Sequence, residues 1–235
     1  MAVQAQTKST TTIQQVWLGY SNQIRFSNKW GGWIDLQLRT KENFFTNFSQ
    51  SFVRGSLVYY INDATKFSIG DAWVQYFPGD NHKLMTTNEH RPWQQFQWHT
   101  NYAKTKTMQW VRLEERFRQK VLNDSTLAGG NNFNFRIRYN FLLQVPLHGG
   151  VIKKGDVSFM LNNEIYVNLG KQFVYNTFDQ NRFFMGLAYY VSPVNYLQFG
   201  YSNVFQQLSN GNTYRSIHIA RVAFFQNMDW RKKQG

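Results

Sequence analysis

The alternation of apolar and polar residues with a period of two is the feature that most constrains this chain. It is clearest in the segment FNFRIRYNFLLQV, residues 133–145. Phe135 and Ile137 share one parity there, and Arg136 and Arg138 share the other. Because successive side chains of a β-strand point to opposite faces, this pattern predicts a strand with one apolar and one polar face.

The same alternation recurs along almost the whole chain, and no segment has helical periodicity of useful length. About eleven segments alternate, most of them about 10 to 14 residues long, whereas globular strands commonly have about 5 or 6. Long strands joined by turns, without helices, favour a large antiparallel barrel or sandwich. The expected strands cover residues 13–26, 33–40, 51–61, 66–77, 93–103, 110–119, 133–145, 157–169, 181–191, 196–208 and 214–225.

The two faces of these strands indicate a membrane barrel. Arginine, asparagine and glutamine dominate the polar parity, whereas lysine concentrates at turns and ends. Arginine suits forked hydrogen bonding in enclosed sites, which favours an interior polar face. Aromatic residues make up 18% of the chain, and Tyr and Trp prefer membrane–water interfaces. A wall that is apolar toward lipid and polar toward a lumen fits both faces, and a soluble calycin-like barrel is the alternative.

The expected fold is therefore all-β: a single antiparallel, up-and-down transmembrane β-barrel of about 10 to 12 strands. Such barrels have an even number of strands when both chain ends lie on one side, so we expect the count of eleven to be wrong by one. No run of about 18 apolar residues exists, which excludes a conventional spanning helix. We expect a signal-peptide remnant or disordered leader over residues 1–12, the barrel over 13–228 and a basic tail over 229–235.

The formal net charge is +13, and such a balance commonly indicates an anionic partner. The basic residues are spread singly along strand-like segments rather than clustered, so we do not expect a nucleic-acid partner. Membrane lipid is the expected environment of the apolar wall. The chain has no cysteine, which excludes disulfides and thiolate chemistry.

The polar parity brings arginines and a few carboxylates into the predicted lumen. One interpretation is an internal Arg/Glu network that fills and stiffens the barrel. The other is that excess arginine binds an anion, such as a small solute or a lipopolysaccharide phosphate. The expected network comprises Arg39, Arg54, Arg112, Glu114, Arg116, Arg118, Arg136, Arg138, Glu164 and Arg182.

Catalytic and metal sites are not expected. His99 and His218 lie in strand-like segments at plausible inner parity, but no Gly-x-Ser-x-Gly motif accompanies them. A lipid-modifying hydrolase would need one of these histidines beside a serine hydroxyl. His82 and His90 lie in the polar connection 78–92, whose spacing matches no ligand motif, so we interpret it as a solvated loop that also holds Asp80 and Glu89. No cofactor is expected.

A series of motifs resembles the DUF2490 family, predicted outer-membrane barrels of Gram-negative bacteria. The motifs are WLGYSNQIRFSNKW, VRLEERFR, FRIRYNF, NNEIYVNLG followed by QNRFFMGLAYYV, and LQFGYSN. They span the chain from about Trp17 to Phe225. The resemblance implies a bacterial outer-membrane location and brings no activity, cofactor or catalytic residue with it. The sequence departs from the family pattern in one respect: the aromatic residue that usually ends the last strand lies some residues before the end of this chain.

Three functions remain open from the sequence. The first is a non-enzymatic structural or accessory protein with a plugged lumen. The second is a porin-like, narrow, anion-preferring channel for small solutes. The third is a lipid-modifying outer-membrane enzyme, which depends on the histidine geometry described above.

Overall fold

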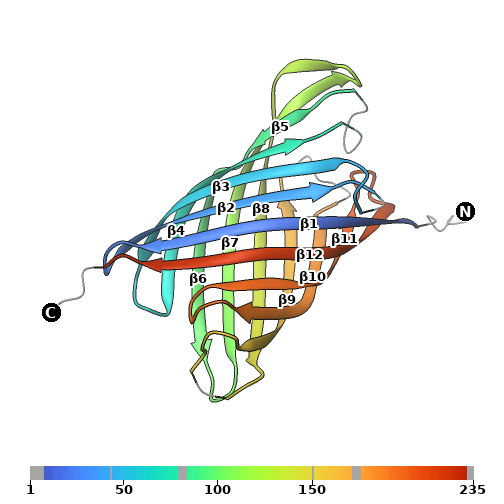
Figure 1. Ribbon diagram of the computed structural model, residues 1–235. Coiled ribbons are helices and arrows are strands. Elements are labelled where there is room, and N and C mark those ends of the chain that lie inside the picture. The colour runs from blue at the N-terminus through green and yellow to red at the C-terminus, as the bar shows by residue number, and fades with distance from the viewer. Residues whose placement is uncertain (1–7, 43, 79–83, 150, 171–175, 232–235) are drawn as a thin grey trace, which may run out of the picture.

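The protein is an all-β barrel built from twelve strands (Figure 1). The computed structural model describes residues 8–42, 44–78, 84–149, 151–170 and 176–231. Among these residues, no helix is long and apolar enough to cross a membrane. The strands are β1 (Ser9–Arg25), β2 (Trp30–Thr40), β3 (Phe48–Tyr60), β4 (Thr65–Tyr76), β5 (Thr87–His90), β6 (Trp93–Asn101), β7 (Lys106–Asn123), β8 (Thr126–Pro146), β9 (Val157–Leu169), β10 (Phe178–Tyr190), β11 (Tyr196–Gln207) and β12 (Thr213–Asp229).

Two of these strands, β5 and β6, share one position in the wall. Both pair with β4 on one side and with β7 on the other, in a single continuous register. Arg91 and Pro92 separate them. Pro92 has no N–H to donate, so the ladder is interrupted at that residue. Over the described residues, the twelve strands therefore occupy eleven positions around the barrel.

The ring closes where β12 meets β1, and this pair is parallel, from Ser9 beside Thr213 to Arg25 beside Asp229. All other neighbours are antiparallel. The barrel fold is confirmed, but the expected even number is wrong, because an odd ring of consecutive hairpins must close with a parallel pair. As a consequence, β1 begins and β12 ends at opposite ends of the barrel (Figure 1).

The two ends differ in their connections. At the tight-turn end, residues 26–29, 61–64, 102–105 and 191–195 connect successive strands, and residues 147–156 form a longer connection between β8 and β9. At the long-loop end, most connections are longer, but Asp124 and Ser125 alone join β7 to β8. This hairpin extends beyond its neighbours, since β8 pairs with β9 only from Phe135 onward.

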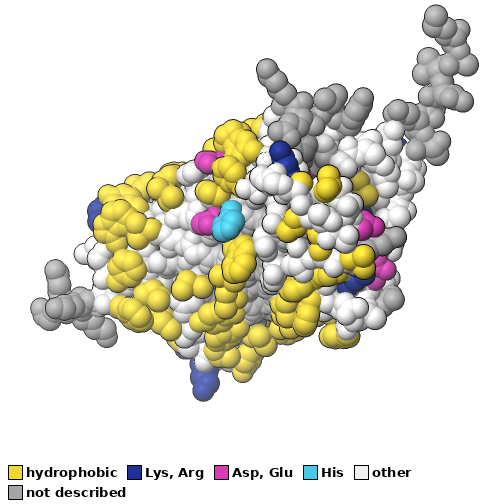
Figure 2. All heavy atoms as spheres, turned by 90° about the horizontal axis from the view of Figure 1, so that it is seen from above, with side chains coloured by type: hydrophobic (Ala, Val, Ile, Leu, Met, Phe, Trp, Pro, Cys, Tyr) yellow, Lys and Arg dark blue, Asp and Glu magenta, His cyan; other side chains and the backbone are white. Residues whose placement is uncertain are grey.

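The outer wall is apolar and the interior is polar, as the alternation predicts. Outward side chains such as Ile34, Leu57 and Ile69 are about half exposed, and hydrophobic side chains spread over the outer face in Figure 2. Inward arginines such as Arg112 and Arg136 are buried. Glu115 lies on the outer face, where its Oε1 accepts a 3.4 Å hydrogen bond from Gln94.

The strand boundaries extend the expected barrel of residues 13–228 slightly. β1 begins at Ser9 and β12 ends at Asp229. Residues 1–7 of the expected leader and 232–235 of the expected tail lie outside the described residues.

Candidate functional site

A first charge cluster fills the lumen toward the long-loop end, around Glu89 on β5. This carboxylate is fully buried. It accepts hydrogen bonds from Arg116 Nε at 2.6 Å and Nη2 at 3.0 Å, and from Arg91 Nε at 2.7 Å. Arg118 Nε lies 3.3 Å away, with its side chain partly exposed at the rim. One carboxylate thus bonds three arginines: Arg116 and Arg118 on β7, and Arg91 between β5 and β6.

A second cluster continues from the first toward the middle of the barrel. Glu114 on β7 accepts from Arg136 Nε at 2.9 Å and also bonds Arg138. Arg136 Nη1 reaches Asp179 on β10 at 2.7 Å, and Arg138 bonds Glu164 on β9. The cluster therefore links the wall from β7 to β10 through charge-assisted hydrogen bonds, which are stronger than neutral ones.

Large side chains complete this closure. Val74, Tyr166 and Val204 are almost completely buried in the same half of the lumen. Arg182 on β10 lies 5.3 Å from the ring centre of Trp17 on β1, a contact that crosses the interior. The long-loop half of the lumen is therefore filled with side chains rather than open.

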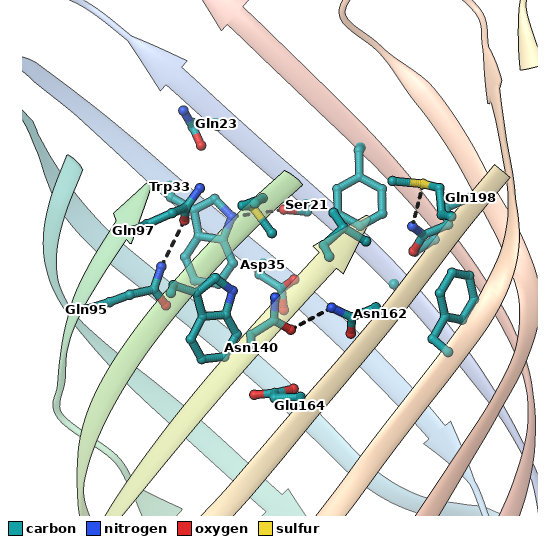
Figure 3. Close-up of a pocket in the computed structure, with 18 of the residues that line it drawn as sticks. Ser21, Gln23, Trp33, Asp35, Gln95, Gln97, Asn140, Asn162, Glu164 and Gln198 are labelled. Carbon is teal, nitrogen blue, oxygen red and sulfur yellow. Dashed lines mark hydrogen bonds between the residues drawn. The ribbon is translucent and has the colours of Figure 1, made fainter. Parts of the chain in front are cut away.

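A pocket of about 370 Å³ occupies the other half and extends to the tight-turn end. Gln23, Lys66, Asn101 and Lys106 line it close to the ends of their strands. Figure 3 shows Ser21, Trp33, Asp35, Gln95, Gln97, Asn140, Asn162, Glu164 and Gln198 around this space.

Four arginines of this pocket differ from those of the two clusters: Arg39, Arg112, Arg182 and Arg221. In the described part of the chain, none of them lies within 4.0 Å of a carboxylate oxygen. By contrast, Arg54, which also lines the pocket, is paired with Asp35 at 2.5 Å. Eight cationic and two acidic side chains line the pocket, so the cations exceed the acids by six.

Aromatic rings and amides hold the unpaired arginines in place. Arg39 lies 3.7 Å above the Trp17 ring and donates to Gln50 and Gln37 at 3.0 Å each. Arg112 lies 3.9 Å above Trp93 and donates to Gln95 at 2.9 Å. These cation–π and amide contacts orient the guanidinium groups without neutralising them.

The structure brings nine of the ten sequence-predicted network residues into the interior and places the tenth, Arg118, at the rim. Seven are buried: Arg39, Arg112, Glu114, Arg116, Arg136, Arg138 and Glu164. Arg54 and Arg182 are partly buried. The sequence did not distinguish arginines that find a carboxylate from those that do not.

Several inward charged residues are absent from the predicted network, among them Glu89, Arg91, Asp179 and Arg221. Glu89 and Arg91 lie in a segment interpreted as a solvated loop, and that interpretation is wrong because Thr87–His90 forms β5. The signal was available: Glu89 and Arg91 continue the inward parity of Trp93 and Gln95. Asp179 lies at a register irregularity on β10. Arg221 shares its inward parity with buried Ile217 and Ile219, so the apolar residues obscured its side of the strand.

His99 and His218, the two histidines considered for a Ser–His pair, have other partners in the described structure. His99 lines the pocket, with its Nε2 2.8 Å from Gln97 Nε2. The inner parity expected for His218 is wrong: its Nδ1 lies 2.7 Å from the hydroxyl of the exposed Tyr201, on the outer wall. Neither His99 nor His218 forms a hydrogen bond with a serine among the residues that the structure describes. The geometry required for the lipid-modifying hydrolase is therefore not met there.

Metal ligation has no support among the described residues, where no group of three or more His, Cys, Asp or Glu side chains could hold an ion. His90 lies on the outer face, 3.6 Å from Asp71. Asp80 and His82 lie outside the described residues.

Comparisons with known proteins identify a family but no activity. The model of the family described as protein of unknown function (DUF2490) matches residues 14–215, which is most of the chain. No curated protein matches. A similar solved structure is described as the NanC porin in a rhombohedral crystal form, with a TM-score of 0.48 and 14% sequence identity. The alignment covers 86% of this chain and 93% of that one.

Proposed function

This chain belongs to the DUF2490 family, and we propose that it is an outer-membrane β-barrel that serves as a closed structural or accessory protein rather than an open pore. The observation that carries the proposal is the pair of buried charge clusters around Glu89 and Glu114, which fill the long-loop half of the lumen. A lumen blocked over half of its length has no continuous aqueous path.

The outer wall supports the membrane location. Exposed apolar side chains continue around the strands, and a closed ring leaves no unpaired sheet edge, which lipid would not tolerate. We expect the apolar band to contact outer-membrane lipid. Separation of inner and outer membranes on a density gradient tests this: the protein should sediment with the outer membrane, and recovery in the soluble fraction would contradict it.

Single-channel recording tests the closed lumen. The refolded protein, inserted into a planar bilayer, should give no steady conductance steps. Insertion is verified on the same sample by heat-modifiable migration and by protection from protease, so that silence is meaningful. Steady steps from the wild-type protein would contradict a closed lumen.

A narrow anion-preferring channel is the second candidate, and the unpaired pocket arginines favour it. Arg136 and Arg138 are neutralised by carboxylates, so we do not expect them to set the ion preference. If anion-selective steps do appear, Arg112→Glu with Arg182→Glu should reverse the ion preference, because these two guanidinium groups lack such partners.

A further inference from the structure

We infer that the lumenal pocket is a binding site for a small organic oxyanion, a carboxylate or a phosphate carried on a flat body. The inference concerns the pocket at the tight-turn end and goes beyond the closed lumen. It does not depend on whether the barrel conducts.

The first argument is the set of buried polar atoms without partners. Seven such atoms belong to residues that line the pocket. Five of them are N–H donors: Arg39 Nε, Arg112 Nη1, Arg182 Nε, Asn140 Nδ2 and Trp93 Nε1. The other two are the Ser56 hydroxyl and Gln198 Oε1, which is an acceptor. Buried donors in folded proteins are almost always satisfied. These atoms are almost completely covered, so a ligand rich in acceptor oxygens would satisfy several of the donors after small shifts of the side chains around them.

The second argument is charge. Arg39 and Arg112 are each only 5% exposed, and neither has a carboxylate within ion-pair distance among the described residues. By contrast, Arg116, Arg136 and Arg138 in the same lumen are each paired with a carboxylate. An uncompensated buried cation is costly. The missing counter-charge is therefore assigned to the ligand.

The third argument is shape. The pocket volume of about 370 Å³ lies in the range of small-molecule sites, roughly 300 to 1,000 Å³. The rings of Trp33 and Trp93 lie edge to face, with their centroids 5.9 Å apart. Trp93 is buried beneath Arg112, so the partly exposed Trp33 ring is the indole that would contact a flat ligand.

Amide side chains connect the floor of the pocket to its mouth. Along one wall, Arg112 donates to Gln95, Gln95 donates to Gln97, and Gln97 contacts His99. Lys66 and Lys106 lie at the mouth. They provide positive charge where an anion would enter, and the unpaired arginines provide it where the anion would stop.

The test uses benzoate as the carboxylate probe and phenyl phosphate as the phosphate probe. The full-length protein in nanodiscs of neutral phosphatidylcholine is titrated by calorimetry, and its unfolding temperature is measured with and without each probe. We expect at least one probe to bind and to raise the unfolding temperature, because a ligand specific to the folded state stabilises it. Benzyl alcohol, which is flat but neutral, should do neither.

The variant Arg112→Gln with Arg182→Gln removes two of the unpaired cations. We expect the affinity for the bound probe to fall at least tenfold. Without ligand, this variant should unfold at the same temperature as the wild type or higher, since repulsion among the arginines is relieved. The matched control is Arg118→Gln, an arginine outside the pocket, which should keep the probe affinity.

Anionic lipid could supply the same chemistry, and nanodiscs of phosphatidylglycerol distinguish this source. A change in tryptophan emission caused by phosphatidylglycerol alone, and lost in the double variant, assigns the oxyanion to a lipid headgroup. Binding of a soluble probe in neutral nanodiscs assigns it to a solute. The inference is overturned if neither probe nor lipid acts on the folded protein, or if the double variant retains wild-type affinity.

Discussion

At the scale of single residues, the pairing of each inward charge decides its role. Glu89 is fully buried and forms ion pairs with three arginines, Arg91, Arg116 and Arg118. Arg112 is also buried, but among the described residues it has no carboxylate partner and instead contacts aromatic rings and the Gln95 amide. Inward arginines are thus paired with carboxylates in the long-loop half of the lumen, whereas several arginines of the pocket have no carboxylate partner among the described residues.

Glu89→Gln should destabilise the barrel strongly. The glutamine keeps the size of the side chain but leaves Arg91 and Arg116 buried without a counter-charge, and breaking such a buried pair costs about 3 to 5 kcal/mol. Denaturant unfolding from lipid vesicles, followed by tryptophan fluorescence, measures the loss. Glu115→Gln on the outer wall is the control and should cause no loss. Equal effects of the two substitutions would mean that the Glu89 cluster does not stabilise the fold.

At the scale of strands, the interruption between β5 and β6 comes from one residue. The backbone of Arg91 forms two hydrogen bonds with Ala72 of β4, because each residue donates its N–H to the carbonyl of the other. Pro92 accepts from the Glu115 N–H at 2.9 Å but cannot donate in return. The outward Asp71 accepts from the Arg91 N–H at 3.2 Å beside this break. The wall therefore remains in register across the interruption.

Pro92→Val should close the gap in the ladder. The new N–H can donate to the Glu115 carbonyl, and one such bond contributes about 0.5 to 1.5 kcal/mol to stability. Equilibrium unfolding in vesicles should therefore show a higher midpoint than for the wild type. A lower midpoint would show that the proline ring, rather than the ladder, stabilises this part of the wall.

The depth of the apolar band can be tested on one strand. Met185 is exposed in the middle of β10, and Val191 directly follows its tight-turn end. Met185→Arg should cost about 2 to 4 kcal/mol in a bilayer, whereas Val191→Arg near the interface should cost about 0 to 1 kcal/mol. Unfolding free energies in vesicles measure both. Similar costs at the two positions would contradict the proposed membrane placement of the strand.

At the scale of the whole molecule, the odd number of wall positions fixes how the barrel closes. The parallel seam places Gly19 beside Ala223, and a Cβ built on Gly19 would lie 3.2 Å from the Ala223 Cβ. This is slightly closer than the Cβ–Cβ separation of about 3.5 to 4.5 Å in disulfides, so a small shift would allow a bond.

Gly19→Cys with Ala223→Cys should therefore form a disulfide under mild oxidation. The chain has no cysteine of its own, so a mobility shift that reductant reverses reports this bond alone. Gly19→Cys with Val222→Cys is the control, since Val222 faces outward and should not react. Efficient oxidation of the control pair, or none of the test pair, would rule out the parallel register.

The sequence by itself determined the fold class, the two faces of the strands and the arginine-rich interior. These follow from period-two alternation, which is a local property of each strand. Only the tertiary structure decided that Arg221 points inward, that the ring is odd, and which arginines lack a carboxylate. Those outcomes depend on the register between segments far apart in the chain, and on closure of the ring, which no local pattern specifies.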